Sequence, residues 1–289
     1  MKNLFGYSLL VLLLASSASI CSAEKTSSKK YLLQYKFAMG EVLRYRVNHM
    51  VDMRSTIEGT SQQAESKSES IKAWKVTDVL PNGEIEFVHV VEVVRMSNQV
   101  PDRATRVFDS ETDETPPPGF ELAARAIGVP LSVIRMTPAG EIVNRVEKHP
   151  QPKASDDMPI TLQLAEKPVA VGEQWDATYD VQVERKSGAK LQVRTRRVCT
   201  LKNVKAGIAT INVEYQVLTP VSPYVRSQLV QRMTKGLVRF DIERGRVVSQ
   251  KLDANRRLLG FAGKTSSMHY VSRYEERLLK PGERLARKE

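Results

Sequence analysis

The stretch "AMGEVLRYRV" at 38–47 returns in altered form as "AVGEQWDATYDV" at 170–181. After each Gly-Glu pair, apolar and polar side chains alternate, with Tyr45 in the apolar phase of the first stretch and Trp175 and Tyr179 in that of the second. A period of two is typical of a β-strand with one buried face and one face in water. Each stretch therefore predicts a long strand that starts at a glycine turn.

Similar alternating runs fill most of the chain and are joined by short turn sequences. These joints carry glycine with other turn-forming residues: "LPNG" (80–83), "TPAG" (137–140), "KAG" (205–207) and "ERG" (243–245). Turns of this kind join antiparallel neighbours. The sequence thus predicts a mainly β, antiparallel fold, either a curved, half-barrel-like sheet or a sandwich.

Two short helices are expected between the strands. "GFELAARAIG" (119–128) repeats apolar residues at helical spacing from Phe120 onward. In "SPYVRSQLVQRMTKG" (222–236), Ser222 is suited to the N-cap and Pro223 to the first helical position. A strand, a glycine turn and a second strand follow each helix, so the two halves of the chain present the same features in the same order.

This repeated order predicts an internal duplication with one short helix per repeat. The expected division is a first β-rich repeat at 33–148, a Pro-rich polar linker at 149–159, a second β-rich repeat at 160–279 and a basic C-terminal tail at 280–289. Two further stretches are distinctive: 59–70 is polar and is expected to be a flexible hairpin crossing, and 97–119 is acidic and then proline-rich, so it is expected to be exposed and partly mobile.

The N-terminus has the pattern of a secretory signal peptide. Lys2 precedes an apolar run, and small residues follow up to Ala23, so residues 1–23 are expected to be removed on export to the periplasm or beyond the cell. The alternative is a lipoprotein anchored through an acylated Cys21. After removal of the signal, Cys199 is the remaining cysteine, so we expect neither an intramolecular disulfide nor a transmembrane helix.

The chain lacks a motif that indicates catalysis or metal binding. Its histidines are scattered without the spacing of metal ligands: His49, His89, His149 and His269. "GKT" at 263–265 lacks the first glycine of a phosphate-binding loop, and no nucleophile elbow occurs. Cys199 lies in the apolar phase of its strand, which is typical of a buried, inert thiol. We therefore expect no catalytic residue, no metal site and no cofactor.

An acidic segment, "DSETDE" at 109–114, spaces Asp109, Glu111 and Asp113 as calcium ligands are spaced. It lacks the central glycine of a calcium loop, so a solvated acidic loop is favoured over a cation site.

The formal net charge of +11 indicates an affinity for anions. Export excludes nucleic acid as a partner, which leaves lipid or another amphiphile with an anionic headgroup, an anionic envelope polymer, or an envelope protein. The same charge is also expected of a surface that only keeps a β-rich protein soluble. Nothing in the sequence predicts the oligomeric state.

The segments "YKFAMGEVLRYRV", "PVAVGEQWDATYDV" and "FDIERGRVV" resemble a family of exported, β-rich bacterial proteins known as a domain of unknown function. The resemblance covers most of 33–252 and implies the fold but no chemistry. The expected architecture is also similar to the half-barrels of periplasmic lipoprotein and lipid carriers, and this likeness transfers no residue roles.

These observations favour a non-enzymatic binding protein of the bacterial cell envelope that holds an apolar or amphiphilic ligand on a curved β-sheet. Tyr45, Trp175 and Tyr179 are the candidates for lining the ligand cavity, although the same residues are also expected of a plain core. One alternative is a structural or protein-interaction module of the envelope without a small-molecule pocket. Another is an envelope hydrolase, which would need carboxylates, or a serine and a histidine, brought together by the fold.

Overall fold

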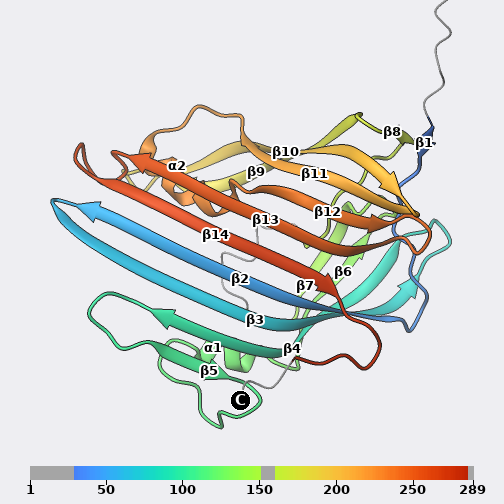
Figure 1. Ribbon diagram of the computed structural model, residues 1–289, viewed down its shortest axis with the longest axis horizontal. Coiled ribbons are helices and arrows are strands. Elements are labelled where there is room, and N and C mark those ends of the chain that lie inside the picture. Colours follow the sequence, from blue (N-terminus) through green and yellow to red (C-terminus); the bar gives the residue numbers. More distant parts are fainter. Residues whose placement is uncertain (1–28, 151–159, 286–289) are drawn as a thin grey trace, which may run out of the picture.

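The computed structural model describes residues 29–150 and 160–285 (Figure 1). The expected signal peptide, Cys21 and nearly all of the expected linker lie outside these residues. The elements, in chain order, are β1 (Lys30–Tyr31), β2 (Val42–Ile57), β3 (Thr60–Val79), β4 (Ile85–Gln99), β5 (Arg106–Asp109), α1 (Glu121–Arg125), β6 (Pro130–Met136), β7 (Ile142–Glu147), β8 (Val169–Ala170), β9 (Gln174–Glu184), β10 (Lys190–Lys205), β11 (Ile208–Val217), α2 (Pro223–Leu229), the 3₁₀-helix η2 (Val230–Arg232), β12 (Lys235–Asp241), β13 (Arg246–Leu259) and β14 (Ser267–Leu278).

Within the described residues, twelve strands form one open antiparallel sheet, which confirms the predicted mainly β, antiparallel class. The strand order is β7-β6-β4-β3-β2-β14-β13-β12-β11-β10-β9, and β5 pairs with β4. β1 and β8 form a separate two-stranded sheet. The last strand, β14, pairs with β2 along its whole length, so it joins the strands of the first half of the chain to those of the second. The internal duplication itself stays a prediction.

The two faces of the sheet differ in character. The face that carries Leu43 and Tyr45, here called the inner face, packs against α1, α2 and the segments 31–37 and 160–165. The opposite, outer face carries alternating polar residues such as Arg44 and is crossed by ion pairs. Figure 1 looks onto the outer face, and the strands at both edges turn away behind the central strands.

The main core lies on the inner face at the end of the sheet where β2 begins. Leu33, Tyr35 and Phe37 from the N-terminal segment and Leu162 and Leu164 from the later segment pack there against side chains of both halves of the sheet. Burying these apolar groups is the main source of stability, because each fully buried large side chain contributes about 1.5–3 kcal/mol. The two segments thereby close this end of the inner face.

The two Gly-Glu stretches, at 38–47 and 170–181, form the same turn. In each, the glutamate carboxylate accepts a hydrogen bond from the backbone N–H three residues before it, and the glycine N–H donates to a carbonyl of the neighbouring strand. The four bonds are Ala38 to Glu41 (3.1 Å), Gly40 to Val76 (3.0 Å), Ala170 to Glu173 (2.9 Å) and Gly172 to Leu201 (2.7 Å). The repeated sequence is therefore explained by a repeated way of starting a long strand.

Both predicted helices are present and both are shorter than the expected ranges. α1 covers five residues within 119–128, and α2 ends at Leu229, after which η2 continues for three residues. Ser222 caps α2, because its hydroxyl accepts a hydrogen bond from the N–H of Val225 at 3.4 Å, and Pro223 is the first helical residue. These features confirm the predicted start of the second helix.

The hairpin expected at 59–70 is present, but it is a tight turn at Glu58 and Gly59 and not a long polar crossing. The chain from Thr60 onward is a strand that pairs with β2, and from Glu65 onward it also pairs with β4. Its alternation is hidden in the sequence because the inner face of β3 carries serines, Ser66, Ser68 and Ser70, instead of large apolar residues.

The first part of the expected basic tail folds against the sheet. Leu279 and Leu285 pack with Ile71 on the outer face, and Arg277 forms an ion pair with Glu283 at 2.5 Å. That pair and the N–H of Lys280 lower the pKa of Glu283 to about 2.

Candidate functional site

A row of polar side chains crosses the inner face of the central strands, and we call it the polar belt. Its members lie on neighbouring strands at positions that are either directly opposite in the register, as Tyr45 and Lys72 are, or diagonal, as Tyr45 and Glu276 are. The belt consists of Gln250 (β13), Tyr274 and Glu276 (β14), Tyr45 (β2), Lys72 and Trp74 (β3), His89 (β4) and Ser132 (β6).

A buried ion pair lies at the centre of the belt. The ammonium of Lys72 is 2.7 Å from a carboxylate oxygen of Glu276, and the two side chains are 12% and 3% exposed. The same oxygen accepts hydrogen bonds from the amide of Gln250 at 3.0 Å and from the hydroxyl of Tyr274. A charge is taken out of water only at a large cost, so this pair depends on its partners.

The Lys72 ammonium also lies over two aromatic rings. It is 5.4 Å from the ring centre of Tyr45 and 5.4 Å from that of Trp74. Cations at this distance are attracted by the negative face of a ring. The lysine is thus held between the carboxylate and two aromatic faces.

Four polar atoms of the belt are buried and have no hydrogen-bond partner among the residues that the structure describes. They are the Tyr45 hydroxyl, the Trp74 indole nitrogen, Nδ1 of His89 and the Ser132 hydroxyl. A buried polar group without a partner costs about 1–3 kcal/mol. Such a cluster is unusual in a core, where nearly all buried polar groups are satisfied, and it is the strongest indication of a binding site on this chain.

Burial shifts the pKa values of these groups toward their neutral forms. The pKa of Tyr45 is held well above its usual value by burial and by the negative charge of Glu276. Burial, with the positive charges of Lys72 and Arg145, lowers the pKa of His89 to about 3. At neutral pH the unpartnered groups are therefore uncharged, and the belt offers neutral donors and acceptors.

Half-buried apolar residues continue the inner face beyond the belt, toward the far end of the strands. Val51 and Met53 of β2 and Met268 of β14 are partly exposed there and contact Val230 of η2 and Tyr270. We call this set the apolar strip. The inner face thus combines neutral polar groups and an apolar surface along the same strands, an arrangement that matches an amphiphile.

The predicted cavity residues come from a central strand, β2, and an edge strand, β9, of the sheet. Tyr45 is 1% exposed and belongs to the polar belt. Trp175 and Tyr179 are half-buried on β9 at the edge of the sheet, where the Trp175 indole donates to the carbonyl of Gln163 at 3.0 Å and Arg197 lies over the Tyr179 ring. Trp175 packs at the margin of the main core that contains Tyr45, and the roles of all three residues in ligand binding stay predictions.

Sequence reasoning missed most of the belt. The signal that could have found it is a charged residue in the apolar phase of a strand. Lys72 is in the same phase as Trp74, and Glu276 is in the same phase as Tyr274 and Leu278. Two such residues of opposite charge in a β-protein indicate a buried pair.

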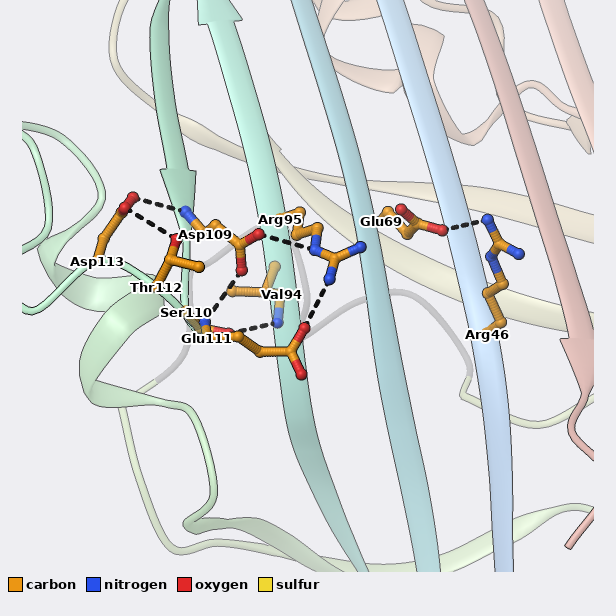
Figure 2. Close-up of polar contacts among 9 residues, drawn as sticks. All are labelled: Arg46, Glu69, Val94, Arg95, Asp109, Ser110, Glu111, Thr112 and Asp113. Carbon is orange, nitrogen blue, oxygen red and sulfur yellow. Dashed lines mark hydrogen bonds and ion pairs between the residues drawn. The ribbon is translucent and has the colours of Figure 1, made fainter. Parts of the chain in front are cut away.

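The acidic loop that resembled a calcium site is held by arginine instead (Figure 2). Asp109 and Glu111 contact the Arg95 guanidinium at 2.8 and 2.6 Å, and Asp113 accepts from the N–H of Asp109 at 2.8 Å. Flexibility was expected for 97–119, but these contacts fix β5 and its loop against β4. Figure 2 also shows the ion pair of Arg46 and Glu69 on the neighbouring strands.

The other features considered in the sequence are possible metal ligands, the Cys199 thiol and a membrane-spanning helix. Within residues 29–150 and 160–285, no group of three or more His, Cys, Asp or Glu side chains is arranged to hold a metal ion. Cys199 is 1% exposed, and burial raises the pKa of its thiol to about 12. In the described part of the chain, no helix is long and apolar enough to cross a membrane.

Comparison with known proteins yields structural likenesses only. No family model matches the chain, and no curated protein matches it. A lipovitellin structure determined for its lipid–protein interactions is 14% identical, with a TM-score of 0.48, over 87% of this chain and 27% of its own. The chain thus spans about a quarter of the length of that protein.

Two further solved structures are more distant. DynF from the dynemicin biosynthesis pathway of Micromonospora chersina is 6% identical, with a TM-score of 0.21, over 86% of this chain and 90% of its own. A DUF1329 family protein from Desulfovibrio piger is 10% identical, with a TM-score of 0.16, over 83% of this chain and 87% of its own. At these values the chain is not placed in a family.

Proposed function

We propose that the protein is a non-enzymatic binding protein that holds an amphiphilic ligand on the inner face of its open sheet. The observation that carries the proposal is the cluster of four buried, unpartnered polar atoms in the polar belt. Ligand atoms that complete these hydrogen bonds would recover the cost of burying them. The apolar part of the ligand would lie along the apolar strip.

The chemistry of the belt favours an uncharged polar group on the ligand. Lys72 and Glu276 neutralise each other, and the unpartnered atoms belong to neutral side chains. The Trp74 indole can only donate, whereas the hydroxyls of Tyr45 and Ser132 both donate and accept. An ester or amide carbonyl next to a hydroxyl fits this set, as in the linkage region of an acylated amphiphile.

Binding at the belt requires a movement of the covering segments. Tyr45, Trp74 and Ser132 are at most 2% exposed, and the Phe37 ring contacts the Trp74 ring at 6.2 Å between centres. The ligand would therefore enter as segment 31–37 moves away from the sheet. We further propose that this takes place in the cell envelope after export directed by residues 1–23.

The experiment is native mass spectrometry, with lipid extraction, of the protein purified from a bacterial envelope. The expected result is a co-purifying amphiphile that is lost in Tyr45→Phe and retained in Tyr35→Phe. Tyr35 is the matched control, because it is equally buried but its hydroxyl is already hydrogen-bonded to the backbone of Leu162. The same spectrum reads the mature N-terminus and so tests cleavage after Ala23.

The close packing of the aromatic residues favours a second candidate, an interaction module without a small-molecule site. The rings of Trp74 and Phe87 stack at 4.6 Å between centres within the main core. A bare polypeptide that added amphiphiles do not shift, in the wild type as in both variants, would contradict the carrier proposal and favour this second candidate.

A further inference from the structure

A basic row crosses the outer face near the hairpin ends of the central strands, at the left of Figure 1. Arg54 of β2, His269 of β14 and Arg257 of β13 are directly opposite one another in the register. Opposite positions on neighbouring strands bring side chains to about 5 Å at Cβ. This row is on the other face from the polar belt, and the groove that it lines also reaches Met268 of the apolar strip at the ends of the strands.

Within the described residues, this row has fewer and more distant counter-charges than the rest of the outer face. Further along the same strands, Arg273 pairs with Asp253 at 3.2 Å and Lys251 with Glu275 at 2.8 Å. Arg257 has no ion pair among the described residues, and Arg54 meets only the carboxylate of Asp52, at 3.7 Å. Arg54 and Arg257 lie on the two sides of His269, whose Nε2 contacts the side-chain oxygen of Asn255 at 2.9 Å, so an anion bound between the two guanidinium groups would supply a counter-charge to both.

The three residues line a groove of about 560 Å³ whose other polar walls are hydroxyls and amides. Thr56 and Ser61 lie within hydrogen-bond distance of each other, at 2.8 Å between their hydroxyl oxygens, on adjacent strands of the groove. Among the described residues, no carboxylate lines this groove. Guanidinium groups with surrounding hydroxyl donors match the oxygens of a phosphate group in charge and geometry.

An exposed apolar side chain flanks the groove at the end of β13. Leu259 lines the groove and is 74% exposed. Exposed apolar residues next to basic ones are typical of surfaces that contact an anionic membrane. This flank favours a phosphate carried by a lipid headgroup over one carried by a soluble molecule.

We propose that the groove lined by Arg54, His269 and Arg257 binds a phosphate group, presented by anionic lipid headgroups. The test measures binding of the full-length mature protein to vesicles of phosphatidylcholine with and without phosphatidylglycerol, and to soluble glycerol 3-phosphate. The tested variant is Arg54→Gln with Arg257→Gln. The matched control is Lys202→Gln with Lys205→Gln, which removes the same charge from exposed residues at the opposite end of the sheet.

The proposal expects binding to anionic vesicles that is weakened at least about tenfold in the groove variant and unchanged in the control. Circular dichroism establishes that each variant is folded. Binding of glycerol 3-phosphate that depends on the same arginines would support phosphate recognition and assign a soluble source if the vesicles do not bind. Absence of binding to either probe, or equal weakening in the groove variant and the control, would overturn the proposal.

Discussion

The ammonium of Lys72 and the carboxylate of Glu276 lie 2.7 Å apart in the interior, although one belongs to the second long strand and the other to the last. Their contact spans β2, which lies between β3 and β14 in the sheet. The ion pair therefore joins the two halves of the chain at the centre of the inner face.

Breaking this pair is expected to destabilise the protein more than removing both charges. Lys72→Met leaves Glu276 buried without its cation, and Glu276→Gln leaves Lys72 without its anion, so each should lower the free energy of unfolding by about 3–5 kcal/mol. The double variant should lower the free energy of unfolding by clearly less than the sum of the two single losses, as measured by urea unfolding. Strictly additive losses would show that the two charges do not depend on each other.

Tyr45→Phe and Tyr35→Phe are expected to change stability in opposite directions in ligand-free protein. The Tyr45 hydroxyl lacks a partner among the described residues, so its removal should raise the free energy of unfolding by about 1–3 kcal/mol. The Tyr35 hydroxyl bonds the backbone of Leu162, so its removal should lower that free energy. Thermal unfolding of delipidated protein checks the signs, and a loss of stability in both variants would indicate that Tyr45 is satisfied.

His89 is expected to make stability depend on pH below neutrality. Burial, with Lys72 and Arg145 nearby, lowers its pKa to about 3 in the folded protein, against about 6.5 in the unfolded chain. Between these two pKa values the imidazole is protonated in the unfolded chain but neutral in the folded protein. The stability that the neutral His89 provides is therefore fully present above pH 6.5 and is lost as the pH falls toward 3. His89→Gln should reduce the slope of unfolding free energy against pH by about 1.4 kcal/mol per unit between pH 5 and 6. An unchanged slope would contradict the burial of this imidazole.

Arg95→Met is expected to loosen β5 and its loop without unfolding the sheet. The guanidinium binds both Asp109 and Glu111, and hydrogen bonds to charged groups contribute about 1.5–3 kcal/mol each. Hydrogen exchange should therefore accelerate in residues 106–113 and stay unchanged in β13 and β14. The control is Arg194→Met, which removes an exposed pair with Asp180. Equal acceleration of hydrogen exchange in residues 106–113 in both variants would mean that Arg95 does not hold β5 and its loop in place.

Gly140→Ala is expected to destabilise the core far more than Gly188→Ala. Both glycines have positive φ, 83° and 82°, so the strain of the backbone is shared. A Cβ at Gly140 would come within 2.6 Å of the Leu162 carbonyl and of the Tyr35 ring, whereas nothing lies within 4 Å at Gly188. The difference in unfolding free energy between the two variants thus measures the clash alone. Similar losses of unfolding free energy in the two variants would show that segment 160–165 can move away from residue 140 at little cost.

Local pattern predicted much of the fold because strand periodicity and turn chemistry are encoded in neighbouring residues. The alternation around Tyr45, the glycine turns and the Ser222 cap all have this origin. The pairing of β14 with β2 could not be predicted, because no local signal states which distant strand completes an edge. The belt was missed for the same reason: the neighbours that make Tyr45 unusual, Lys72 and Glu276, meet only through that pairing.

The position of β14 also determines when the sheet can be completed. Until residues 267–278 have been synthesised, β2 has a free edge some 16 residues long, because its second neighbour does not yet exist. Such an edge readily pairs with other chains, and contacts so distant in sequence form slowly. The newly made chain is therefore expected to depend on chaperone protection until β14 pairs with β2.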